Sequence, residues 1–433
     1  MAMDGKELVE KLAKLSQVQS IKDIPQLTHA LFPGTHCPLM GAAMAVGGIK
    51  DSLIVVVGTD ECTYYTKSMT IHSEKFGGID GRCVSVVLDD HDVTFGSAEK
   101  VQEAFKEIIE EYRPQCVFLV TTCVIEIIGD DFDAISEGLS KLYGIPVLPV
   151  HTEHFKCEDH LPGLERTITV CAEMMKSCDC ENSVNLLGQR MGDFATTELY
   201  AMLQKAGVKI GLQLPCGCSV DDIKNAAAAK VNIVVNDIAL PLAQKMQEKF
   251  GIPYVYFNKF VIPEKIYEAY KNLFVYLELE LPGELEGLYQ NAREKIEKNK
   301  GELEGITYIY GNTPYAVFEM NCFLSSLGMV PQVIQTNRYT EADEPYAKEI
   351  LQYTDPYVCK AANIAPLQYV YDVLSPYLYL GHEFGNRLRQ KGIAIVDSDR
   401  ASGMLGFEVT GYLLQQLVKS VREAKEYRKE LGL

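Results

Sequence analysis

The chain has 433 residues, 47% of them hydrophobic, and a formal charge of −18 at pH 7. This length exceeds what one hydrophobic core organises, and the acidic balance argues against nucleic acid or anionic lipid as partners. No apolar run reaches the roughly 18 residues of a membrane span, and the charged start MAMDGKELVEKLAKL is unlike a signal peptide. We therefore expect a multidomain cytoplasmic protein without membrane contact.

Short β-branched runs alternate with amphipathic stretches of helical length, which is the pattern of parallel sheets with crossover helices. The pattern recurs in three α/β blocks. After a helical N-terminal extension (1–35), the expected domains cover 36–182, 183–300 and 301–433. The polar segments 176–182 and 293–304 mark the boundaries, and the spacing of Lys and Glu across 286–304 indicates a solvated helix.

The individual elements are predicted in chain order. In the first block, strands are expected at SLIVVVG (52–58), CVSVVLDD (83–90), CVFLVTT (116–122) and IPVLPV (145–150), with helices over 98–111 and 131–142. The second block has SVNLLG (183–188), VKIGLQL (208–214), VNIVVN (231–236) and IPYVYF (252–257), with helices near 194–205 and 221–229. The third has ITYIYG (306–311), VPQVIQ (330–335), YLYLG (377–381) and IAIVDS (393–398), with a closing helix over about 409–425.

Thirteen cysteines without an export signal indicate a reducing compartment, in which thiols stay free or bind metal rather than form disulfides. Neither GxGxxG nor GxxxxGK[ST] occurs, so no motif points directly to a bound dinucleotide or ATP. The loops after the strands are the expected place for a site, because open α/β sheets bind ligands beyond the carboxyl ends of their strands.

Three cysteines occupy junctions of the first block. Cys62 and Cys123 each follow a strand, and Cys37 lies where Gly34 and Pro38 mark a loop that opens a helix. A thiolate at such a junction is stabilised by backbone N–H groups and the helix dipole, and iron-sulfur ligation requires thiolates. A Cys₄ cluster would take its fourth ligand from a second chain. The spacing alone leaves a structural role for each thiol open, since the three form no C-x-x-C pair.

The motifs HCPLMGA, GTDECTYYT, VTFG before a helix, and TTCVIEIIGDD occur in the order found in nitrogenase component 1 proteins. The chain resembles that superfamily, which includes molybdenum-iron protein subunits, cofactor-assembly scaffolds and dark-operative protochlorophyllide reductase. The likeness is strong over about 35–162 and continues more weakly through SVNLLG, KVNIVVN, IPYVYFN and GMLGFEVTGYLLQQL. In the motif TTCVIEIIGDD, the last three residues, Gly129, Asp130 and Asp131, indicate the start of a helix.

The resemblance implies an α/β fold of three Rossmann-like domains, with mainly parallel sheets flanked by helices. It also implies that Cys37, Cys62 and Cys123 hold an interfacial iron-sulfur cluster, either 4Fe-4S or a larger P-cluster-like one. The implied partners are a homologous component 1 subunit, in a homo- or hetero-oligomer, and a separate ATP-dependent iron protein that delivers electrons.

Two positions depart from the nitrogenase pattern. Alignment of KVNIVVNDIALPLA places Asn236 at the cysteine that holds the iron-molybdenum cofactor, and GMLGFEVTGY places Leu405 or Met404 at its histidine ligand. An Asn carbonyl is a poor substitute for thiolate, and Leu or Met offers at best a weak thioether. The sequence therefore argues against dinitrogen reduction on that cofactor.

Other candidates lie outside the three cysteines. Cys216 and Cys218 in QLPCGCSVDD follow a strand and would anchor a second metal cluster of unknown type, with two structural thiols as the alternative. Cys359 is a further metal candidate, and His382 is a candidate proton donor whose alternative is a hydrogen-bonded structural role. Cys178 and Cys180 also form a C-x-C pair, but their position in a linker favours an exposed, incidental role. A weaker metal candidate, for zinc, is the group His151, His154, Cys157 and His160.

Three functions fit these features. The favoured one is an oxidoreductase subunit that takes low-potential electrons from the iron protein through the cluster and reduces a small molecule or tetrapyrrole. The alternative is a non-catalytic scaffold for metal-cluster assembly, although Asn236 departs from the scaffold subunit's cysteine as well. A metal-free α/β binding protein is disfavoured, because it has little physical reason to place three thiols at strand ends.

Overall fold

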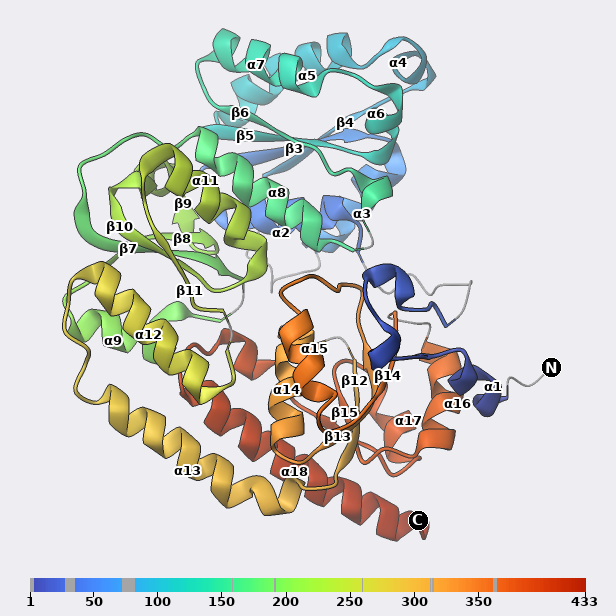
Figure 1. Ribbon diagram of the computed structural model, residues 1–433. Coiled ribbons are helices and arrows are strands. Elements are labelled where there is room, and N and C mark those ends of the chain that lie inside the picture. Colours follow the sequence, from blue (N-terminus) through green and yellow to red (C-terminus); the bar gives the residue numbers. More distant parts are fainter. Residues whose placement is uncertain are drawn as a thin grey trace.

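The computed structural model describes residues 4–27, 36–71, 82–157, 159–190, 192–258, 260–311, 313, 315–360 and 364–433. Within these ranges the chain forms three larger β-sheets with helices packed against them (Figure 1). Their strand pairs are parallel, except that β1 joins the third sheet antiparallel. The expected α/β class with mainly parallel sheets is confirmed.

The first sheet, at the top of Figure 1, has the strand order β4-β3-β5-β6. Every residue of β3 and β5 is buried, because helices cover both faces of these central strands. The strands are β3 (Ser52–Gly58), β4 (Cys83–Val87), β5 (Cys116–Thr121) and β6 (Val147–Val150). The helices are α2 (Pro38–Gly47), α3 (Asp60–Ile71), α4 (Asp90–Phe95), α5 (Ala98–Tyr112), α6 (Cys123–Ile128), α7 (Phe132–Tyr143) and α8 (Leu161–Val170).

The second sheet has the order β11-β10-β7-β8. Its strands are β7 (Glu181–Gln189), β8 (Lys209–Pro215), β10 (Ala229–Val234) and β11 (Tyr254–Tyr256), and its helices are α9 (Glu198–Lys205), α10 (Val220–Lys224), α11 (Leu240–Phe250) and α12 (Pro263–Leu277). The helix predicted over 221–229 is wrong at its end, because a 3-10 turn (Ala226–Ala228) leads directly into β10. A short parallel pair, β2 (Ile49–Lys50) with β9 (Cys218–Ser219), links the first and second units.

The third sheet has the order β1-β14-β13-β12-β15-β16. Its strands are β1 (Ala13–Lys14), β12 (Thr307–Tyr310), β13 (Val330–Gln335), β14 (Tyr357–Cys359), β15 (Leu378–Leu380) and β16 (Ala394–Val396). The helices are α14 (Val317–Ser326), α15 (Glu344–Ile350), α16 (Ile364–Leu374), α17 (Gly385–Arg389) and α18 (Glu408–Leu431). The expected N-terminal extension contributes α1 (Gly5–Glu10), which packs on α16, and the strand β1.

The second and third units are connected by α13 (Leu285–Leu303), the solvated helix that the sequence predicts. It lies beside the long helix α18 at the bottom of Figure 1, and Arg422 of α18 binds Glu302 of α13 with an Nη2–Oε1 distance of 2.8 Å. The boundaries placed at 182 and 300 stay predictions. β7 begins at Glu181, and α13 continues to Leu303.

Helices α2 and α8 cross with their backbones in contact. A Cβ at Gly41 would lie 1.9 Å from the His160 carbonyl oxygen, and a Cβ at Gly163 would lie 1.9 Å from the Pro38 carbonyl oxygen. Only glycine fits at these two points. The crossing therefore fixes the start of α2, just after Cys37, against the start of α8.

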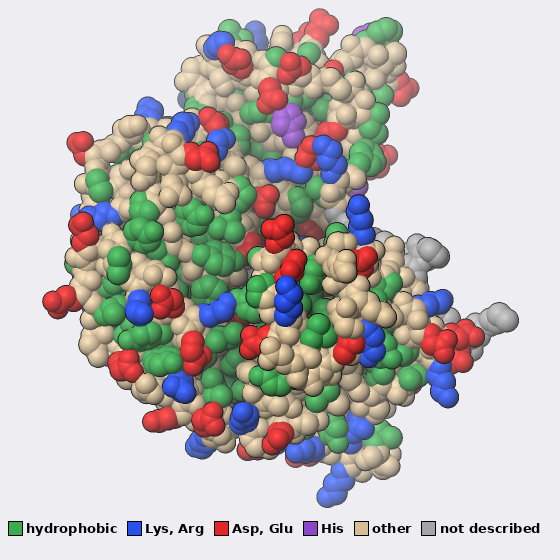
Figure 2. Space-filling model, viewed as in Figure 1, with side chains coloured by type: hydrophobic (Ala, Val, Ile, Leu, Met, Phe, Trp, Pro, Cys, Tyr) green, Lys and Arg blue, Asp and Glu red, His purple; other side chains and the backbone are tan. Residues whose placement is uncertain are grey.

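The surface carries charges of both signs. On the face of the described chain that Figure 2 draws, acidic and basic side chains are interspersed, and Lys and Arg form no continuous patch. Within the described ranges, no helix combines the length and apolar character that crossing a bilayer requires.

Phe105→Ala is expected to lower the free energy of unfolding by about 3–5 kcal/mol, because it leaves a cavity beneath α5. Phe105 is fully buried, with its ring centroid 5.9 Å from that of Tyr143. Urea denaturation followed by circular dichroism measures the change. Phe95→Ala is the matched control, since Phe95 is 76% exposed, and we expect a change within about 0.5 kcal/mol. Equal effects of the two substitutions would contradict the packing described for α5.

Candidate metal centre

Cys62 and Cys123 are brought together by two adjacent strands. β3 and β5 run parallel, with Val57 opposite Thr121. Cys62 lies in the first turn of α3, shortly after β3 ends, and Cys123 is the first residue of α6, just after β5. Because parallel strands end at the same edge of a sheet, both thiols lie at that edge and at helix N-termini.

Cys37 reaches the same place from a different element. It is the residue before α2, with an extended backbone, and Pro38 occupies the first helical position, where its missing N–H leaves no donor unpaired. Helix α2 contacts β3, β5 and α3, and this packing carries the start of the helix to the other two cysteines. Gly34, which the sequence places in the preceding loop, lies outside the described residues.

The electrostatics of Cys62 show how close the three thiols are. Burial raises the pKa of the Cys62 thiol, a hydrogen bond with the Thr59 side chain opposes this shift, and the neighbouring sulfurs of Cys123 and Cys37 raise the pKa further. All three cysteines are partly buried and free of disulfides. The structure therefore places Cys37, Cys62 and Cys123 in one group, called the three-cysteine group below.

The spacing of the sulfurs is informative. Among the described residues, only Asp89, His91 and Asp92 bring three candidate ligand atoms within 4.8 Å of one another. The three sulfurs therefore do not all lie that close to one another, whereas a metal–sulfur bond of about 2.3 Å would set neighbouring sulfurs around one tetrahedral ion about 3.8 Å apart. A polynuclear cluster has wider spacing, since each thiolate binds a different iron. The donor set fits such a cluster.

Glu126 holds Cys123 in position. Its Oε1 accepts hydrogen bonds from the hydroxyls of Thr121 (2.8 Å) and Thr152 (3.0 Å) and from the N–H of Glu153 (2.5 Å), and its Oε2 accepts one from the N–H of His154 (3.1 Å). These bonds tie the first turns of α6 to the loop after β6. Glu126 is therefore a positioning residue for the thiol three residues before it.

The segment 129–131 (GDD), which follows Cys123 in the chain, ends one helix and starts the next. Gly129 ends α6 with φ +82°, and the Asp131 carboxylate accepts a hydrogen bond from the N–H of Ala134 (2.9 Å) at the start of α7. Asp130 accepts hydrogen bonds from the N–H (2.7 Å) and hydroxyl (2.6 Å) of Ser97. This is the helix-start geometry that the sequence indicates.

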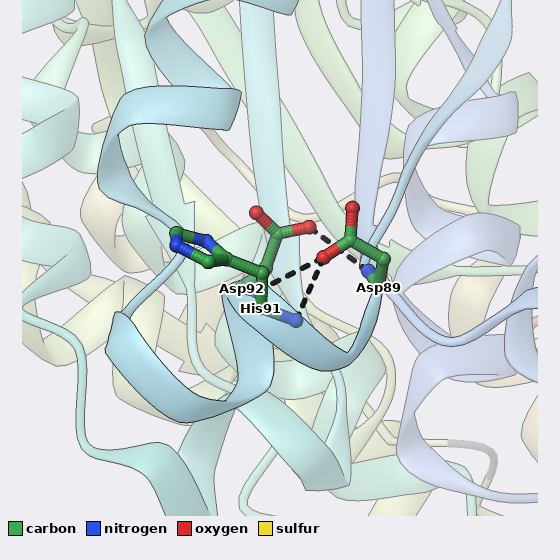
Figure 3. Close-up of side chains that lie close together, drawn as sticks. All are labelled: Asp89, His91 and Asp92. Carbon is green, nitrogen blue, oxygen red and sulfur yellow. Dashed lines mark hydrogen bonds between the residues drawn. The ribbon is translucent and has the colours of Figure 1, made fainter.

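The group Asp89, His91 and Asp92 is a helix cap (Figure 3). Asp89 Oδ1 accepts from the N–H groups of His91 (2.9 Å) and Asp92 (3.1 Å), and Asp92 Oδ2 accepts from the N–H of Asp89 (2.9 Å). Lys100 Nζ lies 3.0 Å from Asp89 and 2.5 Å from Asp92, and this contact lowers the pKa of Asp89 to about 2. The two carboxylates thus already have a cation and two helix N–H groups as partners.

A polar chain leads from the three-cysteine group toward Cys216. His36 Nδ1 is hydrogen-bonded to the Tyr65 hydroxyl, and the His36 and His160 ring centroids lie 6.4 Å apart. Arg190 Nη2 donates to His160 Nε2 (3.5 Å), and Cys216 Sγ donates to the Arg190 carbonyl (3.2 Å). Burial, reinforced by the Arg190 charge, lowers the pKa of His160 to about 4, so this imidazole is neutral at pH 7.

The remaining candidates occupy varied environments. Cys218 and Cys359 lie in hydrophobic cores, 1% and 0% exposed, and burial raises the pKa of each thiol to about 12. His382 is exposed, with Nε2 3.4 Å from Asp399 Oδ1. Cys178 and Cys180 are exposed, and the ligand atoms of His151, His154, Cys157 and His160 do not converge within 4.8 Å. These candidates stay predictions.

The positions that align with the nitrogenase cofactor ligands have structural roles here. Asn236 caps a 3-10 turn (Asp237–Ala239), its side chain accepting from the N–H of Ile238 (3.2 Å). Leu405 is 1% exposed in the core beneath the second sheet, and its N–H donates to Glu408 Oε1 (3.2 Å). Met404 packs against the core of the third unit.

A buried acid cluster, which the sequence analysis missed, joins the second and third units. We define it as Asp237, Tyr256, Asn258 and Glu319. Asp237 follows β10, Tyr256 ends β11, and Glu319 lies in the first turn of α14. Glu319 is 4% exposed, and burial raises the pKa of its carboxyl to about 7. The available signal was an acidic residue within the mostly apolar run VFEMNCFL.

The model of the nitrogenase component 1 type oxidoreductase family matches residues 37–422. The chain belongs to this family. Its described three-sheet architecture agrees with a solved structure of nitrogenase Cp1 at pH 6.5, at a TM-score of 0.76 and 15% identity over 92% of this chain and 94% of that one. A second nitrogenase Cp1 structure, at pH 5, matches with a TM-score of 0.66 and 19% identity. These likenesses show a shared component 1 fold.

Curated relatives of this component 1 type chain include two kinds of protein. It is 30% identical over 224 residues to the nitrogenase iron-molybdenum cofactor biosynthesis protein NifE of Clostridium pasteurianum, a match that covers 51% of this chain and 49% of that protein. It is 24% identical over 330 residues to the nitrogenase molybdenum-iron protein alpha chain of Methanosarcina barkeri, covering 72% and 62%. The matched stretch thus spans about half of the first relative.

The raised pKa of Glu319 predicts a pH dependence of stability. A carboxyl whose pKa rises from 4.5 to about 7 on folding contributes stability that is complete below pH 4.5 and is lost as pH rises through 7. Between pH 5 and 8, the wild type should lose about 3 kcal/mol relative to Glu319→Gln, at 1.36 kcal/mol per pKa unit. Urea unfolding of both proteins at the two pH values measures this, and parallel pH profiles would contradict it.

Proposed function

We propose that this chain is a reductase subunit that holds one part of an interfacial iron-sulfur cluster through Cys37, Cys62 and Cys123. The observation that carries the proposal is the three-cysteine group itself, in which two adjacent strand ends and one helix start present partly buried thiols to the same space. Helix N-termini and the Thr59 hydrogen bond favour the thiolate form.

The cluster, 4Fe-4S or a larger P-cluster-like one, would relay single low-potential electrons when bound. Electrons would come from a separate ATP-dependent iron protein, as the component 1 resemblance implies. The substrate is a small molecule or a tetrapyrrole. We do not propose dinitrogen reduction, because Asn236 and Leu405 are engaged in capping and packing and offer no soft ligand to the familiar cofactor.

A homologous component 1 subunit, either a second copy or a related chain, would complete the cluster. Three thiols leave at least one ligand of a four-cysteine site to another chain. Exposed apolar side chains lie on α3 and α6, which carry two of the cysteines, and on α4, which contacts α6: Tyr64 on α3 is 73% exposed, Ile127 on α6 is 70% exposed, and Phe95, the last residue of α4, is 76% exposed. Such a concentration of apolar side chains is typical of an interaction surface. We place the assembly in the cytoplasm, where thiols stay reduced.

The triple variant Cys37→Ala/Cys62→Ala/Cys123→Ala should lose its iron and its electron paramagnetic resonance signal, because alanine provides no ligand. The measurement is iron content and spectrum after strictly anaerobic purification. The pair Cys178→Ala/Cys180→Ala, which changes two exposed thiols, is the control and should keep both. A triple variant with the wild-type iron content and signal would refute the assignment.

A second function, a scaffold for metal-cluster assembly, is favoured by the relatives named as cofactor biosynthesis proteins. The scaffold would carry a precursor cluster on the same three cysteines and pass it on once. The two functions differ in turnover. A reductase that carries its cluster would reduce substrate repeatedly, whereas a scaffold would donate its cluster once.

Reduction assays with an iron protein and ATP separate the two functions. The probes are protons, read as dihydrogen, and protochlorophyllide, read by its absorbance. We expect multiple turnovers per cluster, because a relay cluster returns to its starting state after each electron. One-time donation of the cluster to an apo-enzyme without turnover would instead identify a scaffold.

A further inference from the structure

The acid cluster lies where the second and third units face each other. Asp237 follows β10, Tyr256 ends β11 and Tyr310 ends β12, so carboxyl ends of strands from both sheets contribute. Helix α14, which carries Glu319, lies on the side of the third unit nearest to α12 and β11 (Figure 1). Ligands of open α/β sheets bind beyond such strand ends, and small-molecule sites favour boundaries between domains.

Three members of the cluster form hydrogen bonds with one another. The Tyr256 hydroxyl donates to Asp237 Oδ1, and Asn258 Nδ2 donates to the Tyr256 hydroxyl oxygen (2.8 Å) and to Asp237 Oδ1 (3.4 Å). Burial and the adjacent Asp237 raise the pKa of Tyr256, so the phenol keeps its proton. The charges of Asp237 and Tyr256 in this hydrogen-bonded set interact electrostatically with Glu319.

Glu319 differs from them, because one of its oxygens has no partner. The backbone N–H of Val261 hydrogen-bonds to the carboxyl group, yet Oε1 is buried and makes no hydrogen bond to any described residue. Buried polar atoms are nearly always paired, and leaving one unpaired costs about 1–3 kcal/mol. The unpaired Oε1 at this boundary between domains is thus left available to a water or a bound molecule.

The charged and titratable groups around Glu319 influence the pKa of its carboxyl, which lies close to neutral pH. Lys265 lowers its pKa and Asp237 raises it, while the phenols of Tyr256 and Tyr310 and the thiol of Cys322 complete its surroundings. Lys265 Nζ lies 4.0 Å from the ring centroid of Tyr346, where it makes a cation–π contact. Burial outweighs the attraction of Lys265.

We propose that Glu319 donates a proton through Oε1 to the substrate bound between the second and third units. This inference rests on the proposed reductase function. The three-cysteine group would hold a cluster that supplies the electrons when bound. At Glu319, the Oε1–H bond breaks and its proton bonds to the reduced substrate atom. The carboxylate that remains regains a proton from water. A carboxyl with a pKa near 7 suits this role, because it is present in both forms at neutral pH.

The experiment compares wild type, Glu319→Gln and Glu319→Asp as full-length, cluster-loaded proteins, with iron protein, ATP and either protons or protochlorophyllide as probe. Glu319→Gln should reduce kcat about 100-fold or more and remove the part of the pH profile that titrates near 7. KM, iron content and the resonance signal should be unchanged. Glu319→Asp should recover part of kcat, and Glu341→Gln, at an exposed residue of the third unit, should match the wild type.

Infrared titration of the same proteins supplies a readout that does not depend on turnover. The wild type should show a protonated carboxyl band that disappears near pH 7, and Glu319→Gln should lack it. If Glu319→Gln kept the wild-type kcat and pH profile, the proton-donor inference would fail while the reductase function would stand. Loss of iron together with kcat in this variant would also overturn it, because the role would then be structural. Absence of turnover in the wild type would overturn the reductase function and this inference with it.

Discussion

The parallel pairing of β3 with β5 is the constraint on which the site depends. Adjacent strands lie about 4.8 Å apart, and the register that sets Val57 opposite Thr121 makes both end at one edge. Cys62 and Cys123 therefore meet although 60 positions of sequence separate them. A slip of one residue would turn every side chain of a strand to the opposite face. The buried β-branched side chains on both faces prevent that slip, so the core of the sheet also sets the positions of the ligands.

Much of this arrangement was predictable from the sequence, because its signals are local. SLIVVVG and VPQVIQ form β3 and β13 over the predicted residues, and the cysteines at the strand ends stand beside turn-forming residues. The strand β14, Tyr357–Cys359, was not predicted. The approach of Cys37 was not visible either, because it depends on how α2 packs across the sheet.

Glu319 was beyond sequence reasoning for a different reason. Its surroundings come from Asp237, Tyr256 and Lys265, which are far away in the chain and belong to the preceding unit. An isolated acidic residue in an apolar helix has no periodic or motif signal that names its partners. Glu319 is buried, with one unpaired oxygen, only because the second and third units pack together. Its raised pKa therefore depends on both units.

The chain shares its fold with the family but departs from the nitrogenase pattern at individual positions. The fold and the three-cysteine group follow the component 1 pattern, whereas Asn236 and Leu405 use the aligned positions for a turn cap and for core packing. The Leu405 loop is tied to the second unit, since Glu408 accepts from the N–H of Leu405 (3.2 Å) and of Glu198 (3.2 Å). Shared architecture is thus compatible with different ligands at the same loop.

The glycine crossing of α2 and α8 has a mechanical consequence. With Gly41 against the His160 carbonyl and Gly163 against the Pro38 carbonyl, neither helix has room to slide without displacing the other. The start of α2 follows Cys37, and His160 immediately precedes α8. The crossing acts as a linkage. Because the two backbones are in contact at these glycines, a movement of α8 requires the start of α2, next to Cys37, to move as well.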